Sequence, residues 1–235
     1  MLTKVNNSLR IKQRWLWPRN CLLCAASVHT GQDLCAPCAE SLPRSACACP
    51  CCAAKSSDPE TPCGECQKHP PHYAYARAAF AYASPIDHLV QNLKYHHRLE
   101  LSRVLGDYLA DWVVSLEDAR PDILVPVPLH PSRLRERGFN QSLEIARFVA
   151  ERLGLPLDHQ HVRRIRPTTP QTELPREQRR KNVHGAFEAD KGVFAGKRVV
   201  IVDDVMTSGH TANTLASTLL RSGAAEVRVW VVART

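Results

Sequence analysis

The 235-residue sequence has no apolar run long enough to cross a membrane, few aromatic side chains, and no cysteine outside one short stretch. A membrane-spanning helix needs about 20 consecutive apolar residues, so we expect no membrane span. Residues 1–20 are basic but contain no apolar core, so we expect no secretory signal and a cytoplasmic protein. Aromatic residues make up 6% of the chain, which leaves few rings for stacking on nucleic-acid bases.

Acidic residues are outnumbered by basic ones. The chain has 31 Lys and Arg against 23 Asp and Glu, which gives a formal net charge of +8. This balance favours an anionic partner. Three kinds of partner fit: nucleotide phosphates, nucleic acid or a membrane surface. Hydrophobic residues make up 44% of the chain, enough for one medium-sized domain with a small appendage.

The ten cysteines all lie between Cys21 and Cys66. Without an export signal, this clustering indicates metal binding rather than disulfides. Most of them form Cys-x2-Cys pairs, and the pattern repeats after 28 residues. Two such pairs supply the four thiolates of a tetrahedral zinc site. We predict two structural zinc sites, formed by Cys21, Cys24, Cys35 and Cys38 and by Cys49, Cys52, Cys63 and Cys66.

The cysteine spacing leaves two alternatives open. The first pair could share a metal with the third pair, and an iron–sulfur cluster could replace zinc. Cys47 and Cys51 stand outside both quartets. Large apolar residues are scarce here, so metal binding, worth about 10–16 kcal/mol in zinc-finger peptides, would supply the stability. We predict a basic lead (1–20), a double zinc ribbon (21–70) and a larger domain (71–235).

One stretch of the larger domain combines a strand, two carboxylates and a polar loop. Val199 to Val202 are apolar β-formers, typical of a central strand in a parallel sheet. Asp203 and Asp204 follow at its carboxyl end, where open α/β sheets bind ligands. The loop of Thr207, Ser208, Gly209, His210 and Thr211 then enters a helix, whose first-turn N–H groups attract anions.

This order of elements predicts a phosphate site beside carboxylates that suit sugar hydroxyls and Mg²⁺. The plainer alternative is a buried strand whose Asp residues cap a helix. The remaining pattern alternates strands and helices and indicates an α/β fold. We expect strands within 73–82, 122–128, 161–166 (an edge strand) and 226–232 (closing the sheet), and helices from 85, over 99–116 and over 140–153.

Two basic segments supply candidate groups for binding pyrophosphate or another anion. Arginine suits phosphate because its planar fork bonds two oxygens at once. The candidates are Arg133, Arg135 and Arg137 on an expected irregular loop, and Arg179, Arg180 and Lys181 in a long basic loop (167–184) that we interpret as a lid.

The Asp-Asp loop resembles the 5-phosphoribosyl-1-pyrophosphate (PRPP) motif of type I phosphoribosyltransferases. The resemblance implies that Asp203 and Asp204 are the catalytic pair and hold the ribose 2- and 3-hydroxyls. It also implies that Thr207 to Thr211 wrap the 5-phosphate, and that PRPP binds with Mg²⁺. His210 departs from the pattern, because many members of that superfamily have a second glycine there.

A wider resemblance runs from Cys21 to the end of the chain. With Pro126-Val-Pro, Arg135-Glu-Arg-Gly-Phe-Asn-Gln, Gln171-Thr-Glu-Leu and Arg179-Arg-Lys-Asn, the chain resembles the ComF family. This implies a Rossmann-like type I phosphoribosyltransferase domain with a parallel sheet, preceded by a double zinc ribbon. It also implies a role in natural competence and the processing of internalised single-stranded DNA, with competence or DNA-processing proteins as partners.

The sequence therefore supports a PRPP- and Mg²⁺-binding protein of DNA uptake. One alternative is a true phosphoribosyltransferase of nucleotide metabolism, whose acceptor the sequence does not identify. The other is a non-catalytic PRPP sensor or assembly partner. Arginine-rich loops and a few aromatics, among them Tyr95 and Phe139, make single-stranded DNA a candidate ligand.

Overall fold

The computed structural model describes residues 19–28, 33–45, 47–116, 118–167 and 185–235. Most of the predicted basic lead and the candidates Arg179, Arg180 and Lys181 lie outside these residues. The chain divides into two compact units, 1–42 and 43–235, which we describe separately. The domain boundaries expected from the sequence, after residues 20 and 70, stay a prediction.

The smaller unit contains the first cysteine repeat. Its strands β1 (Arg19–Asn20) and β2 (Ser27–Val28) pair in antiparallel fashion. Helix α2 (Ala36–Glu40) follows, with Cys35 as its N-cap residue. Between the two strands the chain turns tightly at Ala25, which has a φ of 62°.

The larger unit begins with a second copy of this arrangement, shifted by the 28 residues seen in the sequence. Ala53 has a φ of 55°, as Ala25 does in the first copy. An antiparallel bridge joins Ala48 to Lys55, at the positions that correspond to Asn20 and Ser27. Helix α3 (Gly64–Lys68) has Cys63 as its N-cap residue. The sequence repeat is therefore a structural repeat.

A four-stranded parallel sheet forms the centre of the larger unit, in the order β3-β8-β7-β4. Its strands are β3 (Ala76–Ala81), β4 (Ile123–Pro126), β7 (Arg198–Met206) and β8 (Glu226–Arg234). The apolar run Val199 to Val202 is buried in β7, which confirms a central strand. The expectation that the last strand closes the sheet is wrong, because β3 pairs with the outer side of β8.

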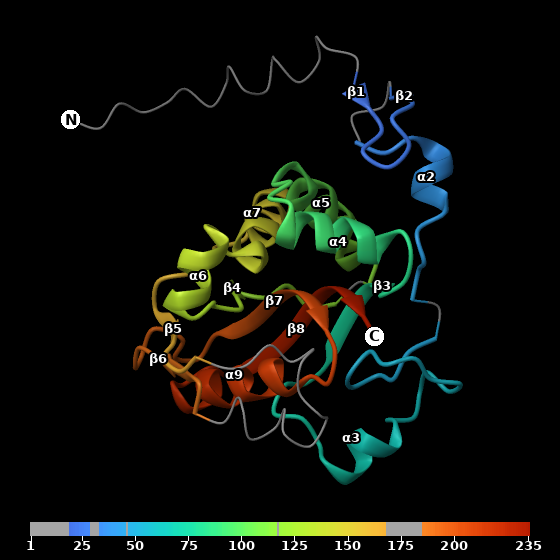
Figure 1. Ribbon diagram of the computed structural model, residues 1–235. Coiled ribbons are helices and arrows are strands. Elements are labelled where there is room, and N and C mark those ends of the chain that lie inside the picture. The colour runs from blue at the N-terminus through green and yellow to red at the C-terminus, as the bar shows by residue number, and fades with distance from the viewer. Residues whose placement is uncertain (1–18, 29–32, 46, 117, 168–184) are drawn as a thin grey trace, which may run out of the picture. The chain divides into compact units, whose positions relative to one another are not determined.

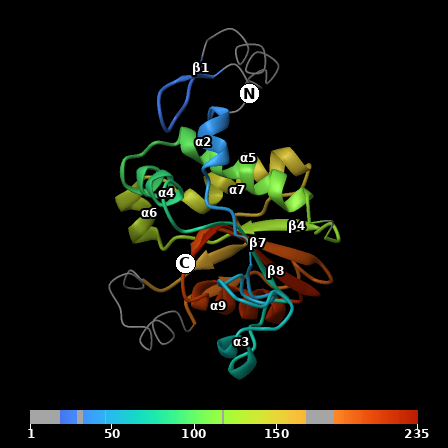
Figure 2. The ribbon, with the colours of Figure 1, turned by 90° about the vertical axis from the view of Figure 1, so that its right-hand side faces the viewer.

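Helices cover both faces of this sheet (Figures 1 and 2). Helices α4 (Ile86–Tyr95), α5 (Glu100–Val114) and α7 (Gln141–Leu153) lie on one face, and α9 (His210–Arg221) lies on the other. Their buried side chains follow the predicted helical spacing, for example Leu89 and Leu93 in α4 and Leu215 and Leu219 in α9. Each face of the parallel sheet is therefore shielded from water.

The segment that carries three candidate arginines is a helix, α6 (Pro131–Arg137), and not the expected irregular loop. Pro131 occupies the first turn, where its missing N–H costs nothing. His130 caps the helix by accepting from the Ser132 backbone N–H, and Gly138 ends it with a φ of 79°. Pro131 therefore marks the start of a helix rather than part of an irregular loop.

The expected edge strand within 161–166 is present but belongs to a separate sheet. Strand β5 (Val162–Arg164) pairs in antiparallel fashion with β6 (Phe187–Ala189), away from the four-stranded sheet. Within the described ranges, no helix is both long and apolar enough to cross a membrane.

Candidate functional site

Two adjacent carboxylates stand at the carboxyl end of β7, between its neighbours β8 and β4. Asp204 is buried, with 3% of its surface exposed, whereas Asp203 is partly exposed. Oδ1 of Asp203 accepts hydrogen bonds from Ser142 Oγ at 2.7 Å and from the Asp204 backbone N–H at 2.9 Å. Helix α7 therefore positions the first carboxylate through its N-terminal turn.

The second carboxylate is held by a lysine from α4 and an amide from α7. Lys94 Nζ forms an ion pair with Asp204 Oδ2. Gln141 Nε2 donates to Asp204 Oδ1 at 3.3 Å. Burial alone would disfavour the charged carboxylate, but the Lys94 charge outweighs it and lowers the pKa of Asp204. The buried group is thus an ionised one with a cationic partner.

Asp203 behaves differently from its neighbour. Burial, together with the negative charge of Asp204, raises the pKa of Asp203 to about 7. The hydrogen bond from Ser142 and the charge of Lys94 oppose this rise but do not cancel it. Within the pair, the pKa of Asp203 is raised and that of Asp204 is lowered, so Asp203 is the carboxylate that takes up a proton more readily.

The loop after β7 leads directly into α9. Gly209 has a φ of 77°, a conformation that side chains rarely adopt, and it is the N-cap residue of α9. The first-turn N–H groups of α9 face the same end of the sheet as the carboxylates. Asp203, Thr207, Gly209 and Thr211 line a small pocket there.

One buried hydroxyl group of this loop is available to hydrogen-bond to a ligand. The Ser208 Oγ is buried and has no hydrogen-bond partner among the described residues. An unsatisfied buried hydroxyl is costly unless a ligand or water completes its hydrogen bond. The donor set of a glycine turn, a hydroxyl and a helix N-terminus fits a phosphate group.

The structure brings only some of the candidate cations to the carboxylates. Arg137 donates to Gln141 Oε1 at 2.6 Å, and Gln141 in turn contacts Asp204. Arg133 pairs with Glu136 on its own helix at 3.0 Å, and Arg135 is exposed. Among the described residues, neither of these two arginines hydrogen-bonds to the carboxylates. Arg137 is therefore the candidate arginine most closely connected to the site.

Sequence reasoning did not include the polar residues Gln141 and Ser142, or Lys94, among the candidate site residues. Both polar residues follow Asn140, whose side chain accepts from the Ser142 and Leu143 backbone N–H groups as an N-cap. In the sequence they are indistinguishable from ordinary capping residues. Only the structure shows that both side chains are buried and therefore face the carboxylates rather than solvent.

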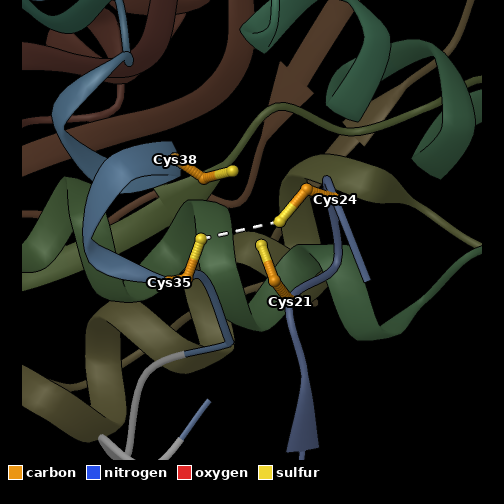
Figure 3. A group of neighbouring side chains, drawn as sticks. All are labelled: Cys21, Cys24, Cys35 and Cys38. Atoms are coloured by element: carbon orange, nitrogen blue, oxygen red, sulfur yellow. Dashed lines mark hydrogen bonds between the residues drawn. The ribbon is translucent and has the colours of Figure 1, made fainter. Parts of the chain in front are cut away.

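The cysteines assemble into two quartets, in the sequential pairing (Figure 3 shows the first). In each quartet all four sulfurs lie within 4.8 Å of one another. Cys24 and Cys35 Sγ are 3.6 Å apart, and Cys52 and Cys63 Sγ are 3.7 Å apart. Tetrahedral coordination with Zn–S bonds of about 2.3 Å requires sulfurs separated by about 3.8 Å. The donor geometry therefore fits zinc, and the interleaved pairing is wrong.

The pKa values of the cysteines shift in opposite directions within each quartet. The hydrogen bond with Cys35 raises the pKa of Cys38, and burial raises the pKa of Cys66. Burial opposes ionisation of Cys21 and Cys49, but backbone N–H groups of the knuckles lower the pKa of each to about 6. One of these N–H groups is that of Cys63, 3.2 Å from Cys49 Sγ. Cys47 and Cys51 lie outside both quartets, although Cys51 packs against the second.

Comparisons with known protein families agree with both parts of the chain. The phosphoribosyl transferase domain family matches residues 140–235, and the double zinc ribbon domain family matches residues 13–67. The fold and these matches define a type I phosphoribosyltransferase-like α/β protein with an N-terminal double zinc ribbon. The two quartets are the structural zinc sites of that ribbon.

The chain is similar over nearly its whole length to curated proteins. It is 36% identical to "DNA utilization protein YhgH" of Salmonella typhimurium, covering 93% of this chain and 98% of the relative. It is 29% identical to "Competence protein F" of Haemophilus influenzae, covering 91% and 96%. The chain belongs to the ComF family.

Among solved structures, a glutamine PRPP amidotransferase from B. subtilis aligns with 28% identity and a TM-score of 0.38. The alignment covers 55% of this chain and 25% of that one.

Proposed function

We propose that the chain binds PRPP with Mg²⁺ at the carboxyl end of β7. The proposal rests on three consecutive features of the chain: the Asp203–Asp204 pair, the Gly209 turn and the N-terminus of α9. Beside them lies the Ser208 hydroxyl, which lacks a hydrogen-bond partner among the described residues. A phosphorylated sugar needs hydroxyl acceptors and a phosphate cradle close together. Both kinds of group are present here on consecutive elements.

Each part of the site has a role in this proposal. The two carboxylates accept the ribose 2- and 3-hydroxyls, and residues 207–211 surround the 5-phosphate. Arg137, with Arg133 and Arg135 on the same helix, faces the pyrophosphate end, and Mg²⁺ enters bound to that pyrophosphate. Arg179, Arg180 and Lys181 complete the anion site from the segment that we interpret as a lid.

The cellular role that we propose follows the names of the relatives. Proteins called competence protein F and DNA utilization protein match this chain across almost their full length. We therefore place the chain in DNA uptake and the processing of internalised single strands, in the cytoplasm. Transfer of the phosphoribosyl group to an acceptor, or sensing of PRPP without turnover, are alternatives within the same site.

Calorimetric titration with PRPP, with and without Mg²⁺, tests the site. The wild type is expected to bind only when Mg²⁺ is present, and Asp203→Asn with Asp204→Asn is expected to abolish binding. As a matched control, Asp58→Asn with Glu60→Gln removes the same charge at exposed positions and should bind normally. Because Lys94 loses its partner in the double variant, Asp203→Asn alone provides a second, milder test. Equal affinity of wild type and both variants would refute the proposal.

A specific surface favours single-stranded DNA as a second ligand. The basic–aromatic rim, formed by Tyr95, His97, Arg98, Arg137 and Phe139, lies between the end of α4 and the start of α7. Tyr95 is 65% exposed, and the Arg137 guanidinium lies 5.7 Å from its ring centre. His97 packs edge-on against Phe139 at 5.8 Å. Exposed rings beside arginines suit stacked bases with neighbouring phosphates.

Fluorescence anisotropy with a labelled 20-nucleotide single strand tests this rim. Tyr95→Ala should weaken binding by about 5- to 150-fold, since base stacking on an aromatic is worth about 1–3 kcal/mol. Val114→Ala, at a residue that is 64% exposed at the end of α5, should have no effect. If about six phosphates are contacted, log K should fall with log salt at a slope of about −4. Identical binding by the two variants would exclude the rim as the DNA site.

A further inference from the structure

The second cysteine quartet is connected to the proposed phosphate loop by one arginine. Arg234 lies at the end of β8, and its Nη1 donates to the carbonyl oxygens of Met206, at 3.1 Å, and Thr207. Its Nε donates to the carbonyl oxygen of Cys52 at 3.0 Å. One guanidinium therefore joins Thr207, the first residue of the phosphate loop, to the Cys49-x2-Cys52 turn, which is the first knuckle of the second zinc site.

The segment that follows this zinc site makes two more contacts with the loop. Tyr73 is 4% exposed, and its hydroxyl lies 3.5 Å from the position that a Cβ on Gly209 would take. The His72 backbone N–H donates at 2.6 Å to the Asn213 side chain in the first turn of α9. The Asn213 N–H donates to the Gly209 carbonyl at 2.9 Å, so this contact also reaches the turn.

The knuckle itself is tied to the sheet. The Ala76 N–H donates to the Cys51 carbonyl at 2.7 Å, and Arg77 NH1 donates to the Pro50 carbonyl at 3.1 Å. Ala53 is buried in the same core cluster as Tyr73. All these residues belong to the larger unit, 43–235, whereas the first quartet belongs to the smaller unit.

We propose that metal in the second quartet fixes the phosphate loop through Arg234, which is thereby a positioning residue of the phosphoribosyl site. The four thiolates repel one another unless a metal holds them, so the position of the Cys52 carbonyl depends on the bound zinc. Because Arg234 hydrogen-bonds to both carbonyl oxygens, the position of the Thr207 carbonyl depends on that of the Cys52 carbonyl. The first quartet has the same chemistry but belongs to the smaller unit. This inference rests on the proposed role of the loop in binding the 5-phosphate.

Three variants of the full chain test this coupling by zinc content and by hydrogen exchange of the amides of residues 207–213. Cys66→Ser should lose about one zinc equivalent, and exchange in the loop should become about tenfold faster or more. Cys24→Ser should lose one zinc equivalent from the first quartet and leave exchange in the loop unchanged. Arg234→Lys keeps the positive charge but loses the planar guanidinium that bonds to Cys52 and Thr207 at once. It should therefore speed hydrogen exchange in the loop while both zinc ions are retained.

Arg221→Lys is the matched control for the arginine. Its guanidinium donates to the Ser217 and Thr218 hydroxyls of its own helix, at 3.3 and 3.4 Å, and it lies in the last turn of α9. Wild-type exchange in the loop of Arg234→Lys would overturn the inference, even if Cys66→Ser fails to fold. Unchanged loop exchange in a folded, zinc-depleted Cys66→Ser would overturn it as well. A wild type that does not bind PRPP would instead refute the proposed function, since the exchange measurement requires no ligand.

Discussion

The two neighbouring aspartates differ at the scale of single residues. Lys94 keeps Asp204 ionised, while burial and the charge of Asp204 raise the pKa of Asp203 to about 7. Asp203 is also the more exposed of the two. In the proposed site, Asp204 is therefore the fixed charge, and Asp203 is the carboxylate whose protonation changes near neutral pH.

This difference predicts a pH dependence of stability. An aspartate in the unfolded chain has a pKa of about 3.9, so folded Asp203 keeps its proton over a window in which the unfolded chain loses it. The contribution of Asp203 to the free energy of unfolding should therefore fall as the pH rises from about 4 to about 7. Asp203→Asn should remove a decrease on the order of 1–4 kcal/mol.

Urea unfolding at several pH values between 4.5 and 8 measures this effect as the difference between wild type and variant, which cancels the other titrating groups. Glu188→Gln, at an exposed position on β6, is the control and should parallel the wild type. A wild type and an Asp203→Asn variant whose stabilities run in parallel across this range would show that Asp203 titrates normally.

The sequence predicted the Asp pair and the loop because strand, carboxylates, glycine and helix start are neighbours in the chain. It could not predict the partners of the carboxylates. Ser142 contacts Asp203 across 61 residues, and Gln141 contacts Asp204 across 63. These contacts depend on how α7 packs on the sheet, which no local pattern encodes.

At the scale of elements, α7 reaches the carboxylates because it packs closely on α5. Gly106 of α5 faces α7, and a Cβ there would lie 2.7 Å from the Phe148 Cβ and 2.9 Å from the Ile145 carbonyl oxygen. Both contacts are shorter than van der Waals distance, and one involves backbone. The helices can approach this closely only with glycine at this position.

Gly106→Ala should therefore push α5 and α7 apart and destabilise the protein by about 1–3 kcal/mol, as overpacking does. Chemical denaturation followed by circular dichroism measures the loss. Gly64→Ala in α3 is the control, because an added Cβ there meets no atom within 4 Å. A Gly106→Ala variant as stable as the control would mean that the two helices can separate at no cost.

The type of an element could be predicted where apolar residues had a clear helical spacing. The prediction failed at one proline, a residue that has two structural roles. The helices on both faces follow the spacing of their buried residues. The segment that carries Arg133 to Arg137 was expected to be irregular, whereas Pro131 favours the first turn of a helix. The position of β8 inside the sheet depends on its pairing with β3, which is remote in sequence.

At the scale of the whole molecule, the double zinc ribbon is one sequence repeat shared between two structural units. The first quartet lies in the unit 1–42, and the second lies in the unit 43–235 with the parallel sheet. The repeat was evident from the cysteine spacing. Its division was not, because the contacts that attach the second copy to the sheet come from Arg77 and Arg234, outside the cysteine-rich stretch.

Because of this division, loss of the first zinc should be a local event. Cys24→Ser should bind one zinc equivalent fewer than the wild type, while the main calorimetric unfolding transition stays within about 2 °C, since the large core is intact. Zinc analysis and differential scanning calorimetry of the full chain measure both quantities. A large drop in the main transition temperature would show that the two units unfold together.

The central claim is that PRPP binds where β7 meets α9, and hydrogen exchange of the full chain with and without PRPP and Mg²⁺ tests it most directly. The account predicts that saturating ligand slows exchange in residues 203–213, and that the Asp203→Asn, Asp204→Asn variant shows no such change at the same ligand concentration. Binding that leaves residues 203–213 unprotected, or that protects only another part of the chain, would contradict the account.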